Sequence, residues 1–494
     1  MPAVRATLSH LAQLGYCEKT IRERLGLADI NDLLWRALPI YRRERLSNRD
    51  ALASAIDLFL LQGVIPLQEV NALFCQTFGQ TDWQVLAQIG VVTVEAGFVR
   101  AQVSLFPVGD RLVFSEHAWP KLPHPGTVDV PHNQVMFVGS DSHWLARSTF
   151  RYPVRNALDL CTGSGIHALL AATHAQRVVA VDINPRAALC TQFNAKIEGI
   201  ANLTILVGDL LEPVGEERFD LLTANPPFVP SPVHSLGFRD GGHSGEDVQR
   251  RIVAALPHHL APGGVAQIIT EIGEREGESI ADRVREWLGG APMDIHLLRL
   301  REYSTAAYAF GHADGEDYGV FLRSVDQWHE NLMAQGYARI IAVLLTIQWS
   351  DPTYGAPWTK SEESKPPVSD RAAVEIEDRL AAERLSRHPG LYRILEQSTV
   401  ERVARISIID AGVLGDESHP KTNAQLLGRA LAIQQWIEPI EREILLRMKV
   451  SQTFAEILTL SHTLGLDEGM TLTVIRSLLQ RGLIALTSAK NGIG

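Results

Sequence analysis

Residues 156–175 read NALDLCTGSGIHALLAATHA, and this stretch decides the fold. The apolar run at 156–160 predicts a strand, and residues 166–175 predict a helix. The loop between them, Asp159–Gly165, contains two glycines, which let a backbone turn tightly and approach a ligand closely. A helix that starts behind such a loop favours a bound carboxylate or phosphate. The stretch therefore predicts a strand–loop–helix unit with a ligand at the loop.

The loop alone does not identify that ligand, because glycine-rich loops bind several kinds of cofactor. It is not the dinucleotide pattern GxGxxG, since Ile166-His167-Ala168 supplies no third glycine. It is not a triphosphate-binding loop either, since no Gly-Lys-Ser/Thr follows. The ligand has to be inferred from residues further along the chain.

Strands and helices continue to alternate after the loop. Alternation at this spacing is typical of a parallel, doubly wound sheet, so we predict an α/β fold with a Rossmann-like sheet. The predicted strands are 177–183, 203–210, 219–228, 265–271, 295–302 and 342–349, and the predicted helices are 185–199 and 248–260.

Acidic residues end the second and third predicted strands. Asp182 in VVAVDI can accept two hydrogen bonds from a ribose diol, and it also suits a helix cap before Pro185. Asp209 in VGDL can accept a hydrogen bond from an adenine amino group, with Leu210 packing near the ring. The carboxyl ends of parallel strands meet at one edge of a sheet, so these acids and the glycine loop predict an adenosine-bearing ligand there.

The tetrad Asn225-Pro226-Pro227-Phe228 follows the fourth predicted strand. Two consecutive prolines exclude regular structure and stiffen the turn. The side-chain oxygen of Asn225 and the carbonyl of Pro226 are both acceptors, and together they can bind the two protons of a planar NH₂ group. Phe228 offers a face on which a base or an amide can stack. Orientation and polarisation of a nitrogen are most of what methyl transfer requires, so the tetrad predicts transfer to nitrogen.

Residues 140–275 resemble the class I S-adenosylmethionine-dependent methyltransferases of the NPPY/NPPF branch, through DLCTGSG, VDINP, GDL and NPPF. Within that branch the chain is similar to the release-factor and ribosomal-protein glutamine methyltransferases and to methyltransferase-small-domain enzymes that modify ribosomal RNA amines. Cys161 stands where many class I enzymes have glycine, and Phe228 in place of tyrosine favours the ribosomal RNA enzymes. The layout of the whole chain also resembles a little-characterised bacterial group of long methyltransferases.

The resemblance implies S-adenosylmethionine as the cofactor and assigns roles to residues. It implies catalysis by Asn225, Pro226, Pro227 and Phe228. It implies that the cofactor is bound by Asp159, Cys161, Thr162, Gly163, Ser164, Gly165, Ile166, Asp182, Ile183, Asp209, Leu210 and Asn225.

The segment after the tetrad is where acceptor substrates usually bind, and the stretch 238–247 resembles the Gly-Asp-Gly region of the glutamine-modifying enzymes. We take Phe228, His234, Arg239 and His243 as candidates for binding the acceptor. Either histidine could act as a general base toward a hydroxyl or carboxyl acceptor, and Arg239 could bind an acidic group. His167, by contrast, is interpreted as structural.

The remaining regions predict flanking domains. Residues 1–115 combine helical spacing with short strands joined at Ala96-Gly97 and Gly109-Asp110, a pattern that is winged-helix-like. For this domain, a role as an adaptor or in dimerisation is favoured over recognition of DNA or of the substrate. The predicted domains are the N-terminal domain 1–115, a linker 116–136, the methyltransferase domain 137–350, a linker 351–370 and a helical, winged-helix-like domain 371–494.

Composition limits the functional classes. The 494 residues carry a net charge of −11, which argues against broad binding to nucleic acid. The four cysteines form no CxxC pair, so neither a disulfide framework nor a metal site is expected. No apolar run of about 18 residues and no signal-peptide core are present, and we expect a cytoplasmic protein without a membrane partner.

Three hypotheses for the function remain at this point. The first is methylation of a planar nitrogen, a glutamine amide or a nucleobase amine, on a protein or RNA. The second is a methyltransferase for small molecules or peptides, acting on nitrogen or oxygen. The third is a regulator that only senses the cofactor, which the complete tetrad disfavours. A homodimer through the flanking domains is a further expectation.

Overall fold

The protein is described by a computed structural model. The description covers residues 2–34, 37–75, 83–109, 111–117, 133–233, 236–315, 317–365, 371–403, 406–411, 421–426 and 432–488.

The chain forms two compact units. The first contains Met1–Ala146, Arg151–Gly289 and Tyr303–Ala342, and the second contains Arg147–Phe150, Gly290–Glu302 and Val343–Gly494.

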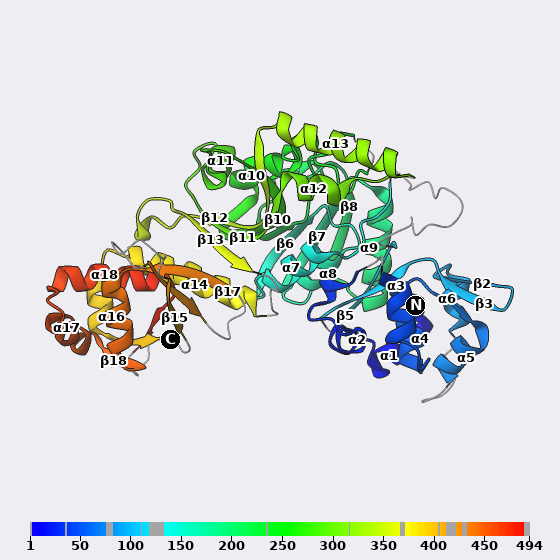
Figure 1. Ribbon diagram of the computed structural model, residues 1–494, viewed down its shortest axis with the longest axis horizontal. Helices are drawn as coiled ribbons and strands as arrows, with labels where there is room; N and C mark the ends of the chain where they lie inside the picture. The colour runs from blue at the N-terminus through cyan, green and yellow to red at the C-terminus, as the bar shows by residue number, and fades with distance from the viewer. Residues whose placement is uncertain are drawn as a thin grey trace. The chain divides into compact units, whose positions relative to one another are not determined.

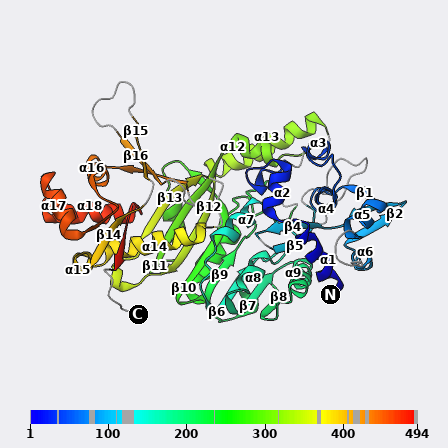
Figure 2. The same ribbon diagram turned by 90° about the horizontal axis from the view of Figure 1, so that it is seen from below.

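Five parallel strands form the centre of the first unit, in the spatial order β8-β7-β6-β9-β10 (Figures 1 and 2). The chain moves in one direction from β6 through β7 to β8, then crosses to the other side of β6 for β9 and β10. The carboxyl ends of β6 and β9 therefore lie at a topological switch point, where open α/β sheets bind ligands. The predicted Rossmann-like sheet is confirmed, with strands β6 Val154–Leu160, β7 Ala175–Asp182, β8 Leu203–Val207, β9 Phe219–Ala224 and β10 Leu260–Arg275.

Helix boundaries around the sheet follow from local capping. Asn184 caps the helix after β7 by accepting a hydrogen bond from the Arg186 N–H at 3.0 Å, and Pro185 occupies the first turn. Gly165 caps the helix after β6 with a φ of +87°, and a Cβ there would lie 2.7 Å from the Thr191 side chain. The helices are α8 Ile166–Ala171, α9 Pro185–Glu198, α10 Asp247–His259 and α11 Ile280–Trp287, with the 3₁₀ turn η3 Glu212–Val214.

The N-terminal part of the first unit contains helices followed by hairpins, as predicted. Ala96 and Gly97 both have positive φ values, 50° and 81°, at the turn between β2 and β3. The order α4, β1, α5, α6 and the β2–β3 hairpin is compatible with a winged-helix-like domain. The winged-helix-like assignment stays a prediction. The elements are α1 Pro2–Gln13, α2 Glu18–Leu25, η1 Ile30–Asp32, α3 Leu38–Glu44, α4 Ala51–Phe59, β1 Val64–Pro66, α5 Leu67–Cys75, α6 Gln84–Gln88, β2 Val92–Glu95, β3 Phe98–Ala101, β4 Ser104–Val108 and β5 Arg111–Ser115.

The N-terminal part shares a core with the Rossmann-like part. Leu11, Phe59 and Leu105 belong to one buried hydrophobic cluster with Leu169 of α8 and Ala195 of α9. Buried Asn194 of α9 adds a polar connection: its side-chain NH₂ donates to the carbonyls of Phe114 in β5 at 2.8 Å and Ser164 at 2.9 Å. Its Oδ1 accepts a hydrogen bond from the Phe114 N–H at 3.1 Å. The predicted boundary between these parts stays a prediction, and most of the predicted linker 116–136 lies outside the described residues.

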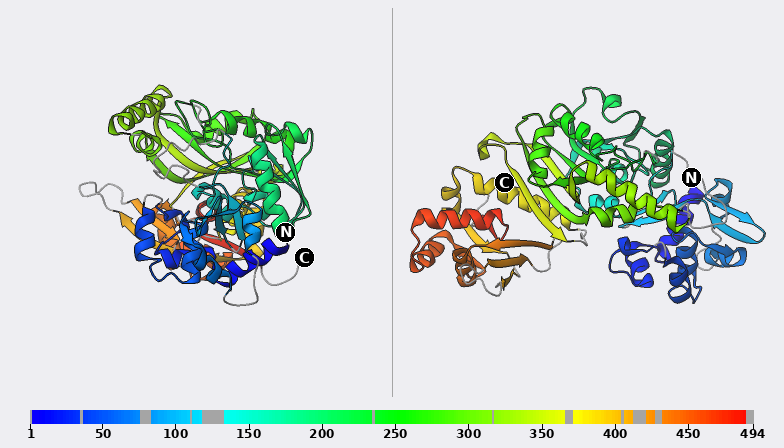
Figure 3. Two further views of the ribbon diagram at one scale, coloured as in Figure 1. Left: turned by 90° about the vertical axis from the view of Figure 1, so that its right-hand side faces the viewer. Right: turned by 45° about the horizontal axis from the view of Figure 1, so that its top comes forward.

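Besides α11, three helices of the described first unit were not predicted from the sequence. Most of α7 Ser140–Ser148 belongs to this unit and precedes β6. A helical pair, α12 Thr305–His312 and α13 Tyr318–Ala334, precedes β12 (Figure 3). Asp317 caps α13 by accepting a hydrogen bond from the Val320 N–H at 2.8 Å. α7 and the α12–α13 pair contribute residues to the site described below.

The second unit contains a strand in the segment predicted as a linker, residues 351–370. Strand β13 Thr359–Lys365 pairs in parallel with β11 Met293–Ser304. This strand could not be predicted from the sequence because Glu362, one of its buried residues, is charged and gives no hydrophobic signal. Glu362 accepts hydrogen bonds from Arg379 at 2.7 Å and from His296 at 2.9 Å. Burial alone would raise the pKa of Glu362, but Arg379 and His296 hold it well below its usual value.

The rest of the second unit contains both helices and strands, and its described part ends in a strand. The predicted final pattern of three helices and a strand is present as α16, α17, α18 and β19, whereas strands β14–β17 were not predicted. The elements are β12 Tyr337–Trp349 (shared with the first unit), η4 Pro352–Tyr354, α14 Ala372–Arg387, α15 Leu391–Glu396, β14 Ser398–Arg402, β15 Ile406–Ala411, β16 Lys421–Leu426, β17 Ala432–Ile437, α16 Pro439–Arg447, β18 Ser451–Thr453, α17 Phe454–Thr463, α18 Glu468–Gln480 and β19 Ile484–Ser488.

Candidate active site

The glycine loop lies at the carboxyl end of β6 and faces open space. Cys161 and Gly163 both have positive φ values, 55° and 56°. A Cβ built on Gly163 would have no heavy atom within 4 Å, so this part of the backbone is accessible to a ligand. Thr162, Ser164 and Ile166 are buried and anchor the loop. The loop therefore presents its backbone, and little else, at the sheet edge.

Asp159 holds the loop from inside rather than facing open space. It is fully buried and accepts hydrogen bonds from the hydroxyls of Thr162 at 2.6 Å and Thr223 at 2.8 Å, and from the Ala168 N–H at 3.2 Å. Burial raises the pKa of Asp159 to about 7, and these three donors only partly oppose that rise. Direct contact of Asp159 with the cofactor, which the resemblance implied, stays a prediction.

This raised pKa predicts a specific pH dependence of stability. An unfolded aspartate titrates near 3.9, so between about pH 4 and pH 7 the folded chain retains a proton that the unfolded chain has lost. The contribution of Asp159 to the free energy of unfolding should therefore fall as pH rises through that window and level off above it. In Asp159→Asn this dependence should vanish. Urea unfolding of both proteins from pH 4.5 to 8 measures the difference; a difference that does not change with pH would contradict the prediction.

Two more predicted cofactor residues lie at the ends of β7 and β8. Asp182 accepts hydrogen bonds from the backbone N–H groups of Gly163 and Asn184, both at 2.9 Å, which ties the glycine loop to β7. Ile183 beside it is 68% exposed, a large apolar side chain left uncovered at the sheet edge. Asp209 forms an ion pair with Arg251 of α10 at 2.7 Å, and Leu210 has a φ of +50°.

Asn225 sits immediately after β9 with its amide fixed in one orientation. Its side-chain NH₂ donates to Asp141 Oδ2 at 3.0 Å and to Ser142 Oγ at 3.2 Å, both on α7. Its Oδ1 is buried and has no hydrogen-bond partner among the described residues. A buried acceptor without a donor is costly, so this oxygen is expected to receive a ligand donor.

The segment after the tetrad is bound to it through the backbone. The Val229 N–H donates to the Arg239 carbonyl at 2.9 Å, and the Gly241 N–H donates back to the Val229 carbonyl at 2.9 Å. Gly245 approaches so closely that a Cβ would lie 2.5 Å from the Phe228 carbonyl oxygen. A side chain at Gly245 is therefore excluded by contact with the tetrad.

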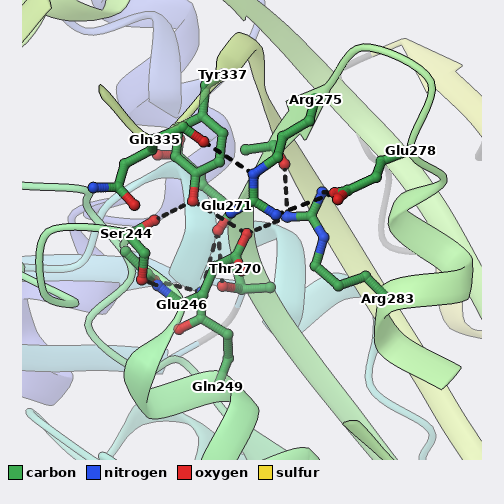
Figure 4. A network of polar contacts seen from close by, with 12 residues as sticks. Ser244, Glu246, Gln249, Thr270, Glu271, Arg275, Glu278, Arg283, Gln335 and Tyr337 are labelled. Atoms are coloured by element: carbon green, nitrogen blue, oxygen red, sulfur yellow. Dashed lines mark hydrogen bonds and ion pairs between the residues drawn. The ribbon is translucent and has the colours of Figure 1, made fainter. Parts of the chain in front are cut away.

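A buried polar network holds the other side of this segment (Figure 4). The hydroxyl of Tyr337 in β12 donates to the Ser244 carbonyl at 2.8 Å and reaches Glu246 Oε1 at 3.3 Å. Arg283 of α11 pairs with Glu246 and with Glu278, the latter at 3.0 Å, and donates to the Gly273 carbonyl at 2.9 Å. Burial raises the pKa of Glu246, although Arg283 opposes that rise. The network connects the start of α10 to β10 and β12.

Removing the Tyr337 hydroxyl should loosen this segment. Tyr337→Phe leaves the half-buried Ser244 carbonyl without this donor, so we expect a loss of about 0.5–1.5 kcal/mol in the free energy of unfolding. Urea unfolding measures this loss. Tyr318→Phe is the control, because the Tyr318 side chain is 76% exposed and its removal should change stability little. Equal effects of the two substitutions would refute the role given to the network.

The candidate acceptor-binding residues occupy different surroundings. Phe228 is half-buried and packs against a cluster that includes Tyr308 of α12 and Trp328 of α13. Arg239 donates to Asp240 at 2.7 Å, and its guanidinium lies 5.3 Å from the centre of the Trp328 ring. His243 is exposed, and its Nδ1 lies 3.4 Å from Asn331 Oδ1 of α13. His234 lies outside the described residues.

Neither a metal-binding cluster nor a membrane-spanning helix is found in the described part of the chain. No group of three or more His, Cys, Asp or Glu side chains there is arranged to hold a metal ion. None of the helices that the structure describes is both long and apolar enough to cross a membrane.

Comparison with known proteins places residues 141–285 in one family model, the methyltransferase small domain. A release factor glutamine methyltransferase from Geobacter sulfurreducens is 38% identical over 133 residues, 24% of this chain and 46% of that protein. A ribosomal protein uL3 glutamine methyltransferase from Bradyrhizobium diazoefficiens is 40% identical over 162 residues, 29% of this chain and 49% of that protein.

A third relative is matched over most of its length. A putative protein N5-glutamine methyltransferase from Methanocaldococcus jannaschii is 32% identical over 154 residues, 29% of this chain and 77% of that protein. The chain spans about half the length of the first two relatives. Residues 141–285, which match the family model, contain the glycine loop, both acids and the tetrad.

Proposed function

Because the chain belongs to the class I S-adenosylmethionine-dependent methyltransferases, in the branch of the protein glutamine methyltransferases, we propose that it methylates the side-chain amide nitrogen of a glutamine in a protein. The observation that carries this proposal is the buried, unpartnered Oδ1 of Asn225. This oxygen is a hydrogen-bond acceptor at the edge of the sheet, and it can bind an N–H group of the incoming glutamine amide.

The residues at the loop fit the cofactor of this family, S-adenosylmethionine. The open backbone at Gly163 leaves room for a ligand, and exposed Ile183 offers an apolar surface for an adenine ring. The oxygens of Asp182 and Asp209 each retain acceptor capacity beyond the bonds they make in the protein. When bound, the cofactor supplies an electrophilic methyl group on a sulfonium.

The tetrad then acts on the acceptor nitrogen. Asn225 Oδ1 and the Pro226 carbonyl would each accept a hydrogen bond from one N–H group of the glutamine amide. These two hydrogen bonds would orient the nitrogen and stabilise the positive charge that develops on it during transfer. In this step the nitrogen would gain a bond to the methyl carbon while the bond from that carbon to the sulfonium sulfur breaks. The electron pair of the broken bond would stay on sulfur, and one proton of the nitrogen would then leave to water. The stiff Pro226-Pro227 turn keeps the two acceptors in place through this step.

A protein acceptor is favoured over a nucleobase on two grounds. The relatives are named for glutamine in a release factor and in ribosomal protein uL3. The net charge of −11 opposes a polyanionic acceptor, although Phe228 would stack on a base as well as on an amide.

Transfer of radiolabelled methyl tests the proposal. The purified protein is incubated with labelled cofactor and, separately, with a recombinant bacterial release factor, ribosomal protein uL3, ribosomes or transfer RNA. Label in a protein fraction that maps to a glutamine is expected. Label only in RNA would move the acceptor to a nucleobase amine, and label in none of these, with cofactor bound, would overturn the proposal.

We further infer that the protein works in the cytoplasm, because its relatives are named for components of translation, and that its flanking domains mediate self-association. Cell fractionation tests the location. Light scattering of the full chain on a sizing column tests the oligomeric state, and a monomer at micromolar concentration would exclude the homodimer.

A further inference from the structure

Helix α7 contributes two side chains to the site, and both contact Asn225. Asp141 Oδ2 accepts one hydrogen bond from the Asn225 NH₂ at 3.0 Å, and Ser142 Oγ lies 3.2 Å from the same nitrogen. Asp141 is only 9% exposed and Ser142 only 5%. Both Nδ2 protons are thereby directed into the protein, and Oδ1 is directed away from α7.

The two α7 residues do not constrain the amide equally. A carboxylate can only accept hydrogen bonds, so ionised Asp141 requires the nitrogen of Asn225 to face it. A serine hydroxyl can donate or accept, so Ser142 alone would tolerate the amide in either orientation. If the amide turned over, its NH₂ would meet the acceptor NH₂, and neither group could accept from the other.

We propose that Asp141 is a positioning residue for methyl transfer: it fixes the orientation of the Asn225 amide and makes Oδ1 a stronger acceptor for the incoming NH₂ group. This inference rests on the proposed function. The second effect follows because a hydrogen bond to a charged group polarises the amide, which shifts electron density toward its oxygen. The charge of Asp141 thus acts on the acceptor nitrogen without touching it.

The surroundings of Asp141 support this role. Gly139 leaves space for the carboxylate: a Cβ there would lie 2.8 Å from Asp141 Oδ1. Burial raises the pKa of Asp141, whereas hydrogen bonds from Asn225 and the Ser142 N–H oppose the rise. The acidic group behind the tetrad is therefore desolvated and bonded to Asn225, and burying an acidic group costs more free energy than burying a neutral polar side chain.

Asp141→Asn is the direct test, because it keeps the shape and removes both the charge and the acceptor-only character. Acting on release factor or uL3, whichever the wild type methylates, the variant should lose 10- to 100-fold in kcat, in line with the worth of a charge-assisted hydrogen bond. The acceptor KM, and the Kd of S-adenosylhomocysteine measured by calorimetry, should stay within about twofold. Ser142→Ala, which leaves Asp141 in place, should lower kcat by no more than about threefold.

Two further variants test whether the effect passes through Asn225. In an Asn225→Ala background, Asp141→Asn should lower the residual rate no further. Gly139→Ala, which displaces the carboxylate but keeps its charge, should lower kcat in the same direction as Asp141→Asn.

An unchanged kcat in Asp141→Asn, an additive loss in the double variant, or a parallel loss of S-adenosylhomocysteine affinity would overturn the inference; the last outcome would make Asp141 merely structural. A wild-type protein that methylates no acceptor is a different failure, which overturns the proposed function and this inference together.

Discussion

Asn225→Ala is expected to lower kcat by about 10²- to 10³-fold, the range measured when one preorganised hydrogen bond at a reacting centre is removed. The substitution deletes the buried Oδ1 and leaves the Pro226 carbonyl as the remaining acceptor for the incoming NH₂. S-adenosylhomocysteine should still bind with a Kd within a few-fold of the wild type, because the glycine loop and Asp182 are untouched. Steady-state kinetics and calorimetry on the same preparations measure both quantities.

Asn225→Asp is the informative companion to this variant. It has the same shape, but it places a second carboxyl group at the position that now bonds Asp141 at 3.0 Å. Two carboxylates so close cannot both ionise easily, so this variant should also be inactive. A kcat within tenfold of the wild type for Asn225→Ala would refute the assignment of Asn225 as the acceptor for the substrate.

Gly245→Ala should have the second-largest effect. The added Cβ would lie 2.5 Å from the Phe228 carbonyl oxygen and 2.8 Å from the Pro230 nitrogen, both of them backbone atoms. The tetrad or the following segment has to shift, and a shift of about 1 Å in an active site can cost about 100-fold in rate. We also expect a stability loss of about 1–3 kcal/mol from the overpacking, beyond the cost of the positive φ.

Gly277→Ala separates these two costs. Gly277 has a φ of +75°, close to the +74° of Gly245, but a Cβ there would have no heavy atom within 4 Å. In this variant the free energy of unfolding should fall only by the cost of placing alanine at a positive φ, about 1–2 kcal/mol, and kcat should not change. Urea unfolding and kcat for both variants provide the comparison. If Gly245→Ala behaves like Gly277→Ala, the close packing on the tetrad does not matter for function.

The sheet and the glycine loop could be predicted from the sequence because their signals are local. The predicted strands of the parallel sheet are short apolar runs; Asp182 is the last residue of β7, Asp209 lies two residues after β8, and Asn225 directly follows β9. Topology then brings these residues to one edge without any further information.

The rest of the site depends on contacts between distant segments. Asp141 contacts Asn225 across 84 residues, and the stretch SDSHWLARS around it has no pattern that indicates an active-site helix. Tyr337 reaches Ser244 across 93 residues. The sequence predicts a linker at β13 because TKSEESK has no apolar residue; a buried ion pair takes the place of the hydrophobic signal.

Asn194 limits how far the catalytic part can be separated from the N-terminal part, whether in evolution or by protein engineering. One buried amide serves both β5 and the carbonyl of Ser164 in the glycine loop, so the catalytic part is not a portable module. A truncation in the predicted linker would strip that amide of its bonds to Phe114 and uncover the apolar surface that α8 and α9 share with the N-terminal helices. A new recognition domain could be grafted onto this chain only together with a redesigned α9.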